Sequence, residues 1–299
     1  MPASLPAIYV EPTEAAEATL PTIAQPDTNT CMVDLWVNRH ESSNTRRNYR
    51  RQARQFLAFV RRPLATVGIG DLQAYIASLE AQAPATRANA TAALRSLLTF
   101  AHETGYIPFN PGRVLKSPAV KNRLAERILN EPDVLRMIAL EPKIRNRVLL
   151  TLLYGAGLRI SEACGLRWRD LTARDKAGQA AVFGKGGKTR VVLLSANTWR
   201  LVMELQGQGG PDDPVFRSRE GGHLDPSQVH RIVKAAARRA GLSDEVSAHW
   251  LRHAHASHSL DRGAPIHLVQ ATLGHASVAT TGRYLHARPT DSSARYLGV

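Results

Sequence analysis

Between residues 31 and 110, apolar residues recur at the three- and four-residue spacing of amphipathic helices. The clearest stripe follows a possible N-cap at residues 42–44 and predicts one long helix. Its members are Tyr49, Ala53, Phe56, Leu57 and Val60. Similar stripes predict helices over 71–80 and 86–102, and Gly105 and Asn110-Pro111-Gly112 end the region. We therefore predict a small helical bundle.

The pattern beyond residue 125 is helical again, with one interruption. Apolar residues alternate over 181–183 and 189–194, on either side of Gly184-Lys185-Gly186-Gly187, which predicts a β-hairpin. The remaining apolar spacing predicts helices over 131–139, 144–155, 161–164 and beyond, 197–206, 225–240, 249–260, 266–273 and 294–297. The fold class is therefore mainly α with a small β-hairpin or sheet, that is, α+β.

The chain of 299 residues is longer than one average domain, and its composition changes at two places. Residues 1–30 hold five prolines and no sustained periodicity, so we expect a disordered tail. Residues 111–124 combine Pro, Gly and basic residues as an extended linker does. We therefore expect a helical domain over 31–110 and a second domain over 125–299.

Charge indicates the partner. The chain has 39 Lys and Arg against 25 Asp and Glu, a net charge of +14 and a pI near 10.4. The tail contains four acids and no Lys or Arg, so the remainder is more basic than this average. Double-stranded DNA is the expected partner, and a basic surface kept for solubility is the alternative.

The first domain carries an arginine-rich helix face with no acid among its members. A solvated face usually mixes charges, so phosphate contact is the favoured interpretation. The candidate DNA-binding residues are Arg46, Arg47, Arg50, Arg51, Arg54, Arg87 and Arg95.

Cysteine content and hydropathy bound the compartment. Cys31 and Cys164 are the only cysteines, and neither lies in a zinc-site spacing. No signal peptide and no apolar run of membrane-spanning length is present. We expect a soluble cytoplasmic protein.

Candidate chemistry begins at Arg159. This arginine lies between helix-breaking glycines and Ser161, so it is exposed at the start of a helix, where backbone N–H groups favour anions. A phosphate clamp and an ordinary surface arginine are both compatible with this position. Glu162 could hold a neighbouring cation in place.

His249 and Arg252 lie three residues apart, on one helical face, where both can address one phosphate. The alternatives are a structural histidine or a metal site, because His253, His255 and His258 follow. A permanently charged arginine disfavours a metal ion, and no H-E-x-x-H spacing is present. We predict no metal and no other cofactor.

His275 and Tyr284 follow near the C-terminus. A lone tyrosine most often packs in a core. Beside cations, however, it can attack phosphorus, because positive charge stabilises both the developing phenolate and the phosphate.

Together these residues resemble the tyrosine recombinase (phage integrase) family, in particular its compact bacterial Xer-type members. The resemblance covers residues 31–299. Its motifs are Gly-Leu-Arg159-Ile-Ser-Glu162, Gly-Lys185-Gly-Gly-Lys-x-Arg, His249-x-Leu-Arg252-His253, Leu-Gly-His275 and Arg-Tyr284-x-His286.

The resemblance implies a role for each residue. Tyr284 attacks the scissile phosphate and forms a 3′-phosphotyrosine. Arg159 and Arg252 grip the non-bridging oxygens, and two histidines, His249 and His275, add hydrogen bonds. Lys185 protonates the leaving 5′-oxygen, with Lys188 as its competitor, and Glu162 orients its neighbours.

The resemblance also implies an assembly. Two domains close around DNA as a C-shaped clamp. Four protomers, as a homotetramer or a heterotetramer with a related recombinase, exchange strands through a Holliday junction without ATP. Residues 293–299 are the candidate segment exchanged between them. The expected role is dimer resolution or mobile-element integration and excision at the bacterial nucleoid. A silent DNA-binding protein and a nuclease without a covalent intermediate are the alternatives.

Overall fold

The structure is a computed structural model that describes residues 29–119, 123–184, 187, 189–207 and 209–285. The chain divides between Lys121 and Asn122 into two compact units, which we describe separately. The expected tail over 1–28 and the expected helix over 294–297 lie outside the described residues.

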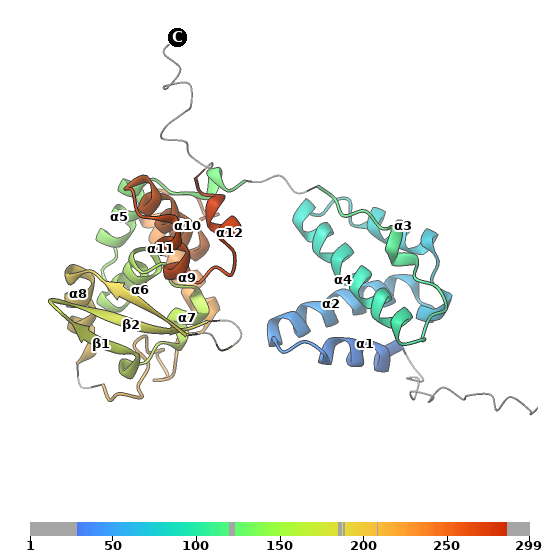
Figure 1. Ribbon diagram of the computed structural model, residues 1–299, viewed down its shortest axis with the longest axis horizontal. Coiled ribbons are helices and arrows are strands. Elements are labelled where there is room, and N and C mark those ends of the chain that lie inside the picture. The colour runs from blue at the N-terminus through green and yellow to red at the C-terminus, as the bar shows by residue number, and fades with distance from the viewer. Residues whose placement is uncertain (1–28, 120–122, 185–186, 188, 208, 286–299) are drawn as a thin grey trace, which may run out of the picture. The chain divides into compact units, whose positions relative to one another are not determined.

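The N-terminal unit is a bundle of helices (Figure 1). Its elements are α1 (Asn29–Asn38), α2 (Ser43–Val60), α3 (Ile69–Ser78) and α4 (Pro84–Glu103), with 3₁₀ turns at Leu64–Thr66 and Pro111–Val114. Helix α2 begins where its cap predicts, since the Ser42 hydroxyl accepts a hydrogen bond from the Thr45 backbone N–H at 3.4 Å. Helix α1 starts inside the stretch assigned to the tail, because the Asn29 side chain accepts a hydrogen bond from the Leu64 N–H at 2.8 Å.

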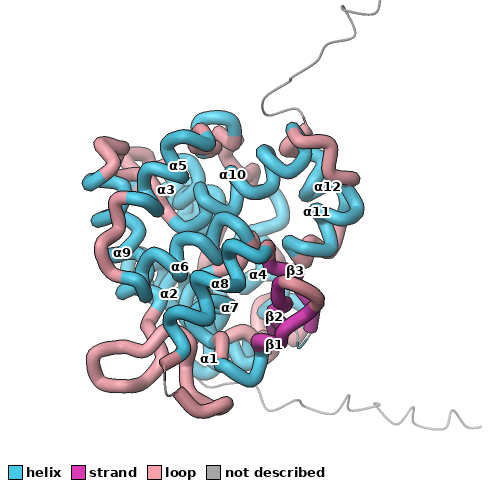
Figure 2. The backbone as a smooth tube through the Cα atoms, turned by 90° about the vertical axis from the view of Figure 1, so that its left-hand side faces the viewer, coloured by secondary structure: helices cyan, strands magenta, loops and turns pink. Residues whose placement is uncertain are grey.

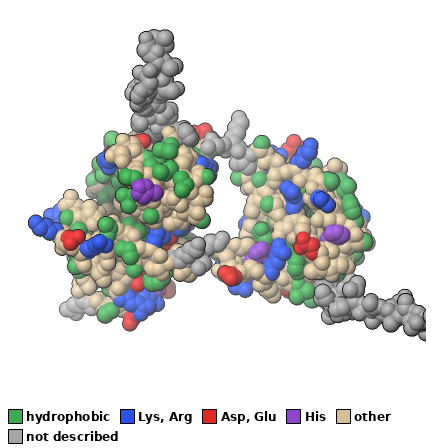
Figure 3. Space-filling model, viewed as in Figure 1, with side chains coloured by type: hydrophobic (Ala, Val, Ile, Leu, Met, Phe, Trp, Pro, Cys, Tyr) green, Lys and Arg blue, Asp and Glu red, His purple; other side chains and the backbone are tan. Residues whose placement is uncertain are grey.

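Apolar stripes from all four helices meet in one core. Trp36 and Phe56 are fully buried there, and Trp36 stacks on Tyr49 with ring centroids 4.7 Å apart. The predicted stripe of α2 therefore faces inward, and its arginines lie on the remaining surface. Blue Lys and Arg side chains are visible at the surface of both units in Figure 3.

The C-terminal unit combines helices with one small sheet (Figure 2, strands in magenta). Its helices are α5 (Glu131–Ala139), α6 (Ile144–Gly155), α7 (Ile160–Gly165), α8 (Ala196–Gln206), α9 (Pro226–Arg239), α10 (Ala248–Asp261), α11 (Ile266–Leu273) and α12 (Val278–Gly282). Short 3₁₀ turns lie at Ala125–Arg127 and Trp168–Asp170. The mainly helical α+β class is thus confirmed.

The sheet has three antiparallel strands in the order β1 (Leu171–Arg174), β2 (Ala177–Phe183) and β3 (Thr189–Leu194). The predicted hairpin corresponds to β2 and β3, which pair with Ala180 opposite Val192. Strand β1 is absent from the sequence prediction, because its four residues bury only Leu171 and show no alternation. Helix α12 is likewise too short for a periodic signal.

Helix α6 is the centre of this unit. Val148, Leu149, Leu152 and Leu153 are fully buried on it and pack in the main core. The end of α6 therefore has a fixed position, and the loop that follows it leads directly into the candidate site. Within the described residues, no helix is long and apolar enough to cross a membrane.

Candidate active site

Arg159 is the N-cap residue of α7, at the junction with α6. Glu162, one turn later, accepts hydrogen bonds from the Arg159 backbone N–H and from its guanidinium Nη1, both at 2.7 Å. The Glu162 side chain is only 2% exposed, whereas that of Arg159 is 33% exposed. The carboxylate therefore fixes an arginine that still reaches solvent.

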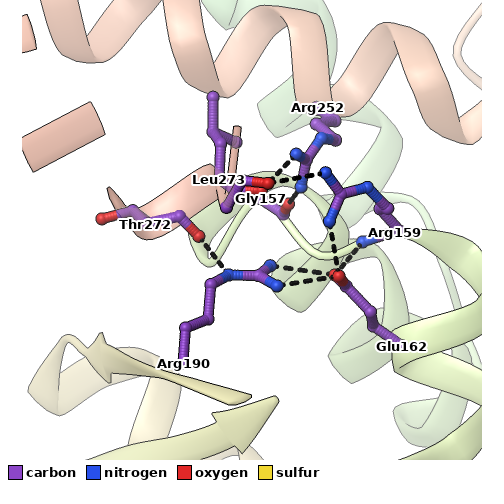
Figure 4. Close-up of polar contacts among 8 residues, drawn as sticks. Gly157, Arg159, Glu162, Arg190, Arg252, Thr272 and Leu273 are labelled. Atoms are coloured by element: carbon purple, nitrogen blue, oxygen red, sulfur yellow. Dashed lines mark hydrogen bonds and ion pairs between the residues drawn. The ribbon is translucent and has the colours of Figure 1, made fainter. Parts of the chain in front are cut away.

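Arg190 on β3 binds the same carboxylate from the other side (Figure 4). Its Nη1 and Nη2 donate to the two Glu162 oxygens at 2.8 and 2.9 Å, and its Nε donates to the Thr272 carbonyl at 2.6 Å. Burial alone raises the pKa of Glu162, but hydrogen bonds from Arg190 and Arg159 outweigh burial and hold it at about 2. Glu162 is therefore ionised at neutral pH.

Arg252, on α10, is almost fully buried at 4% exposure. Its guanidinium donates to the Gly157 carbonyl, in the α6–α7 junction, and to the Leu273 carbonyl at 2.5 Å. Burial and the nearby charge of Arg159 lower the pKa of Arg252 to about 10. The side chain thus stays charged at neutral pH, and its position is set by two main-chain oxygens.

His249 lies one turn before Arg252 on α10, at the start of the helix. Although the residue is solvent-exposed, desolvation and the charges of Arg252 and Arg159 lower the pKa of His249. Its ring stacks on that of His253 at a centroid distance of 5.7 Å. His249 is therefore neutral at pH 7 and available for hydrogen bonding.

Tyr284 follows α12 and is 6% exposed. Its ring packs in a small apolar cluster, and its hydroxyl lies 2.8 Å from His253 Nδ1. Burial raises the pKa of Tyr284, against the opposing charges of Arg252 and Arg283. Burial and the neighbouring His249 lower the pKa of His253 to about 4, so its ring is neutral at pH 7 and can accept a hydrogen bond at whichever ring nitrogen carries no hydrogen.

His275 follows Gly274, which ends α11 in the left-handed conformation at φ 61°. Its Nδ1 lies 2.9 Å from the Thr281 hydroxyl, and its ring stacks parallel to Tyr284 with centroids 6.5 Å apart. Burial and the charge of Arg252 lower the pKa of His275 to about 4. The imidazole is therefore neutral, like those of His249 and His253.

The structure thus brings Arg159, Glu162, Arg252, His275 and Tyr284 into one region, with His249 on the same helix as Arg252. Lys185 and its competitor Lys188 lie outside the described residues.

The sequence gives Arg190 and His253 no catalytic role. Both nevertheless lie in motifs that carry the family resemblance, Arg190 at the end of the hairpin motif and His253 at the end of the motif that begins with His249. Their place in these motifs is the sequence signal that could have identified them.

The arginines of α2 line an open groove on the N-terminal unit. Its walls are Asn38, Ser43, Arg46, Arg47, Arg50, Arg51, Arg54 and Gln55. Arg50 also has an acidic partner from another helix, because Asp34 of α1 accepts its hydrogen bond at 2.9 Å. Arg47, Arg51 and Arg54 are exposed.

On α4, Arg95 is exposed, whereas the enclosed Nε of Arg87 has no hydrogen-bond partner among the described residues. Among all residues that the structure describes, no three His, Cys, Asp or Glu side chains gather as a metal site requires.

Comparison with known proteins gives matches over both units. The phage integrase family profile matches residues 125–291, and the phage integrase N-terminal SAM-like domain matches residues 32–105. Tyrosine recombinase XerC of Xylella fastidiosa (strain M23) is 32% identical over 264 residues, covering 84% of this chain and 89% of the relative. Tyrosine recombinase XerC of Rhodospirillum centenum is 37% identical over 282 residues, covering 87% and 80%.

Solved structures share the fold. The XerH site-specific recombinase bound to its difH substrate gives a TM-score of 0.68 at 22% identity, covering 89% of this chain and 82% of that one. A lambda integrase dimer bound to a COC′ core site gives a TM-score of 0.72 at 19% identity, covering 89% and 79%. With the sequence matches above, the chain belongs to the phage integrase family and is a tyrosine-type, site-specific DNA recombinase.

Proposed function

We propose that Tyr284 is the nucleophile of DNA cleavage. Its hydroxyl oxygen forms a bond to the scissile phosphorus while the bond from phosphorus to the 5′-oxygen breaks. The product is a 3′-phosphotyrosine and a free 5′-hydroxyl. The main support is that main-chain carbonyls and one carboxylate fix two guanidiniums in the region of this tyrosine.

The other residues either stabilise negative charge on the phosphate or donate a proton to the leaving oxygen. Arg159 and Arg252 grip the non-bridging oxygens, and His249 and His275 donate hydrogen bonds as negative charge develops there. Lys185 protonates the leaving 5′-oxygen and Lys188 is its competitor. Glu162 keeps Arg159 in place rather than touching the phosphate.

His253 completes the proton balance at the nucleophile. The phenol proton must leave as the phosphorus–oxygen bond forms, and His253 Nδ1, 2.8 Å from the Tyr284 hydroxyl, takes it in the tautomer that carries the ring hydrogen on Nε2. No ATP enters this scheme, because the covalent link conserves the phosphodiester energy. The two arginines and two histidines supply the charge stabilisation that a metal ion would otherwise provide.

DNA binding and assembly complete the proposal. The groove of α2 contacts the phosphate backbone through its arginines, together with Arg87 and Arg95 on α4. Both units contact the duplex. Four protomers, as a homotetramer or with a related recombinase, exchange strands through a Holliday junction, and residues 293–299 link neighbours. The biological outcome is dimer resolution or mobile-element integration and excision at the bacterial nucleoid.

A suicide DNA substrate tests the nucleophile. A duplex selected by binding from a random pool, then nicked near the cleavage point, traps any covalent intermediate. In EDTA, the wild-type chain should form an SDS-resistant protein–DNA adduct, and Tyr284→Phe should form none. Tyr154→Phe is the matched control, because Tyr154 also contacts a histidine, His258 at 3.0 Å, in another part of the unit.

Three outcomes contradict the proposal. An adduct that survives Tyr284→Phe overturns the assignment of the nucleophile. Cleavage without any adduct favours a nuclease, and binding without cleavage favours a silent DNA-binding protein.

A further inference from the structure

Three consecutive backbone carbonyls at the end of α11 each bind one arginine. Thr272 accepts from Arg190 Nε at 2.6 Å, Leu273 from Arg252 Nη2 at 2.5 Å, and Gly274 from Arg159 Nη2 at 3.1 Å. The last carbonyls of a helix have no partner within it and carry the negative end of the helix dipole. Helix α11 therefore serves as a common anchor for three cations (Figure 4).

Of these three arginines, Arg190 makes the most contacts within the network and has no part in the proposed chemistry. Its side chain is 13% exposed, and three of its nitrogen atoms donate to Glu162 and Thr272. It also comes from a different element, strand β3, which follows Lys185 in the sequence. Arg190 thus joins three segments: the start of α7, the end of α11 and β3.

We propose that Arg190 is a positioning residue for DNA cleavage. Its guanidinium connects three parts of the site. These are the Glu162 carboxylate that holds Arg159, the carbonyl end of α11 just before His275, and strand β3, which follows Lys185 in the sequence. The inference rests on the proposed function. Arg190 acts through Glu162 and the main chain, because Nε, Nη1 and Nη2 each already donate to a protein oxygen.

The pKa of Glu162 provides a test of this role, because it would not change if Arg190 only stabilised the fold. The charged groups that face this carboxylate are Arg159 from α7, Arg190 from β3 and Arg252 from α10. The nearby histidines, His249 and His275, are neutral at pH 7. Without Arg190, burial is opposed by fewer positive partners, so the pKa of Glu162 rises from about 2.

Two substitutions separate geometry from charge. Arg190→Met removes charge and hydrogen bonds, so adduct formation should slow by about 100-fold, the loss typical of a misplaced catalytic group. As the pH is lowered, the rate of adduct formation by Arg190→Met should also begin to fall at a higher pH than the wild-type rate does. Arg190→Lys keeps the charge but cannot make all three bonds, so it should slow cleavage without moving the acid limb.

Arg239→Met is the matched control. Arg239 pairs with Glu141, a second carboxylate with a side chain only 2% exposed, but outside the site. This variant should lose stability like Arg190→Met and keep the wild-type rate and pH profile. The rates are single-turnover rates on saturating suicide substrate, with circular dichroism as the check of folding.

The inference is overturned if Arg190→Met cleaves at the wild-type rate, or if its loss of rate leaves the pH profile unchanged. In both cases the wild-type chain still forms its adduct, so the proposed nucleophile stands. If the wild-type chain forms no adduct, the proposed function and this inference fail together.

Discussion

Three histidines of the C-terminal unit have pKa values that their surroundings lower far below the usual value. Burial is the largest cause in each case, and it lowers the pKa values of His253, His255 and His275 to about 4. His253 and His275 contact or stack on Tyr284, and His255 lies against Gly157. A site that already gathers three arginines would be less stable with further positive charge on these rings.

These pKa values predict that acid destabilises the protein. Above the unfolded value near 6.5, the histidines are neutral in both states. Between pH 6.5 and 4 the unfolded chain binds protons that the folded chain excludes. The free energy of unfolding therefore decreases as the pH is lowered, by up to ~1.4 kcal/mol per pH unit for each histidine. Urea unfolding followed by tryptophan fluorescence at several pH values measures this slope.

The control for this prediction is His255→Gln, because His255 has no role in the proposed chemistry. The variant should lose part of the dependence on pH, because the folded state then excludes one proton fewer. A free energy of unfolding that stays constant between pH 7 and pH 5 contradicts the prediction.

At this scale the sequence offers candidate residues more readily than it predicts their partners. Arg159, Arg252, His275 and Tyr284 became candidates through the order and spacing of their motifs, because each residue alone is also compatible with a structural role. The ion pair between Arg190 and Glu162 joins residues 28 positions apart, and the contact between His253 and Tyr284 spans 31. No periodic pattern specifies contacts of this kind, since they depend on how the elements pack.

Among the elements, the α6–α7 junction carries the closest packing requirement. Gly157 has φ +58°, and an added Cβ would lie 2.7 Å from Leu273 and 2.9 Å from the His255 ring. Its carbonyl also binds Arg252. The turn therefore positions Arg252, a proposed phosphate-binding residue, through a backbone that only glycine adopts without strain.

We predict that Gly157→Ala lowers both stability and cleavage. Strain and overpacking should reduce the free energy of unfolding by about 1–3 kcal/mol, and a displaced carbonyl should slow adduct formation. Gly155→Ala is the control two residues away, because its Cβ would meet only the Thr198 hydroxyl at 3.8 Å. Denaturant unfolding and single-turnover cleavage measure the two effects; equal behaviour of the two variants would contradict this account.

The helices were predictable where apolar spacing continues over at least two turns. The bounds of α5, α6 and α11 match the sequence prediction, because this spacing and a clear stop define each of them. Strand β1 and helix α12 were missed, since four or five residues carry too little pattern. Their places come from pairing with β2 and from packing around Tyr284, which are tertiary effects.

For the whole molecule, net charge makes a prediction about DNA binding. The chain carries +14, and part of it lies along the groove of α2. Each phosphate contact releases condensed counterions, so the logarithm of affinity falls with the logarithm of salt concentration by about 0.9 per contact. Replacing Arg47, Arg51 and Arg54 together by Ala should reduce this slope by about 3.

Fluorescence anisotropy with a labelled duplex at several salt concentrations gives the slope. Arg136→Ala is the control, because Arg136 is exposed but paired with Asp133 at 2.9 Å on α5. It should leave the slope unchanged. An unaltered slope in the triple variant would mean that these arginines do not contact phosphate.

At the same scale, much lies beyond sequence reasoning. Composition and charge predict two domains and a nucleic-acid partner, because they sum over many residues. The DNA sequence that the chain recognises and the proteins that it contacts depend on surfaces assembled from several elements. Neither periodicity nor motif spacing encodes these surfaces.

Because three arginines bind the end of α11, the site depends more on the number of residues in this helix than on the identity of their side chains. A substitution at Thr272 leaves its carbonyl in place. Inserting or deleting one residue within α11 instead turns the helix end by about 100°. All three oxygens would then leave their guanidiniums together, so the site tolerates a change of letter in this helix far better than a shift of register.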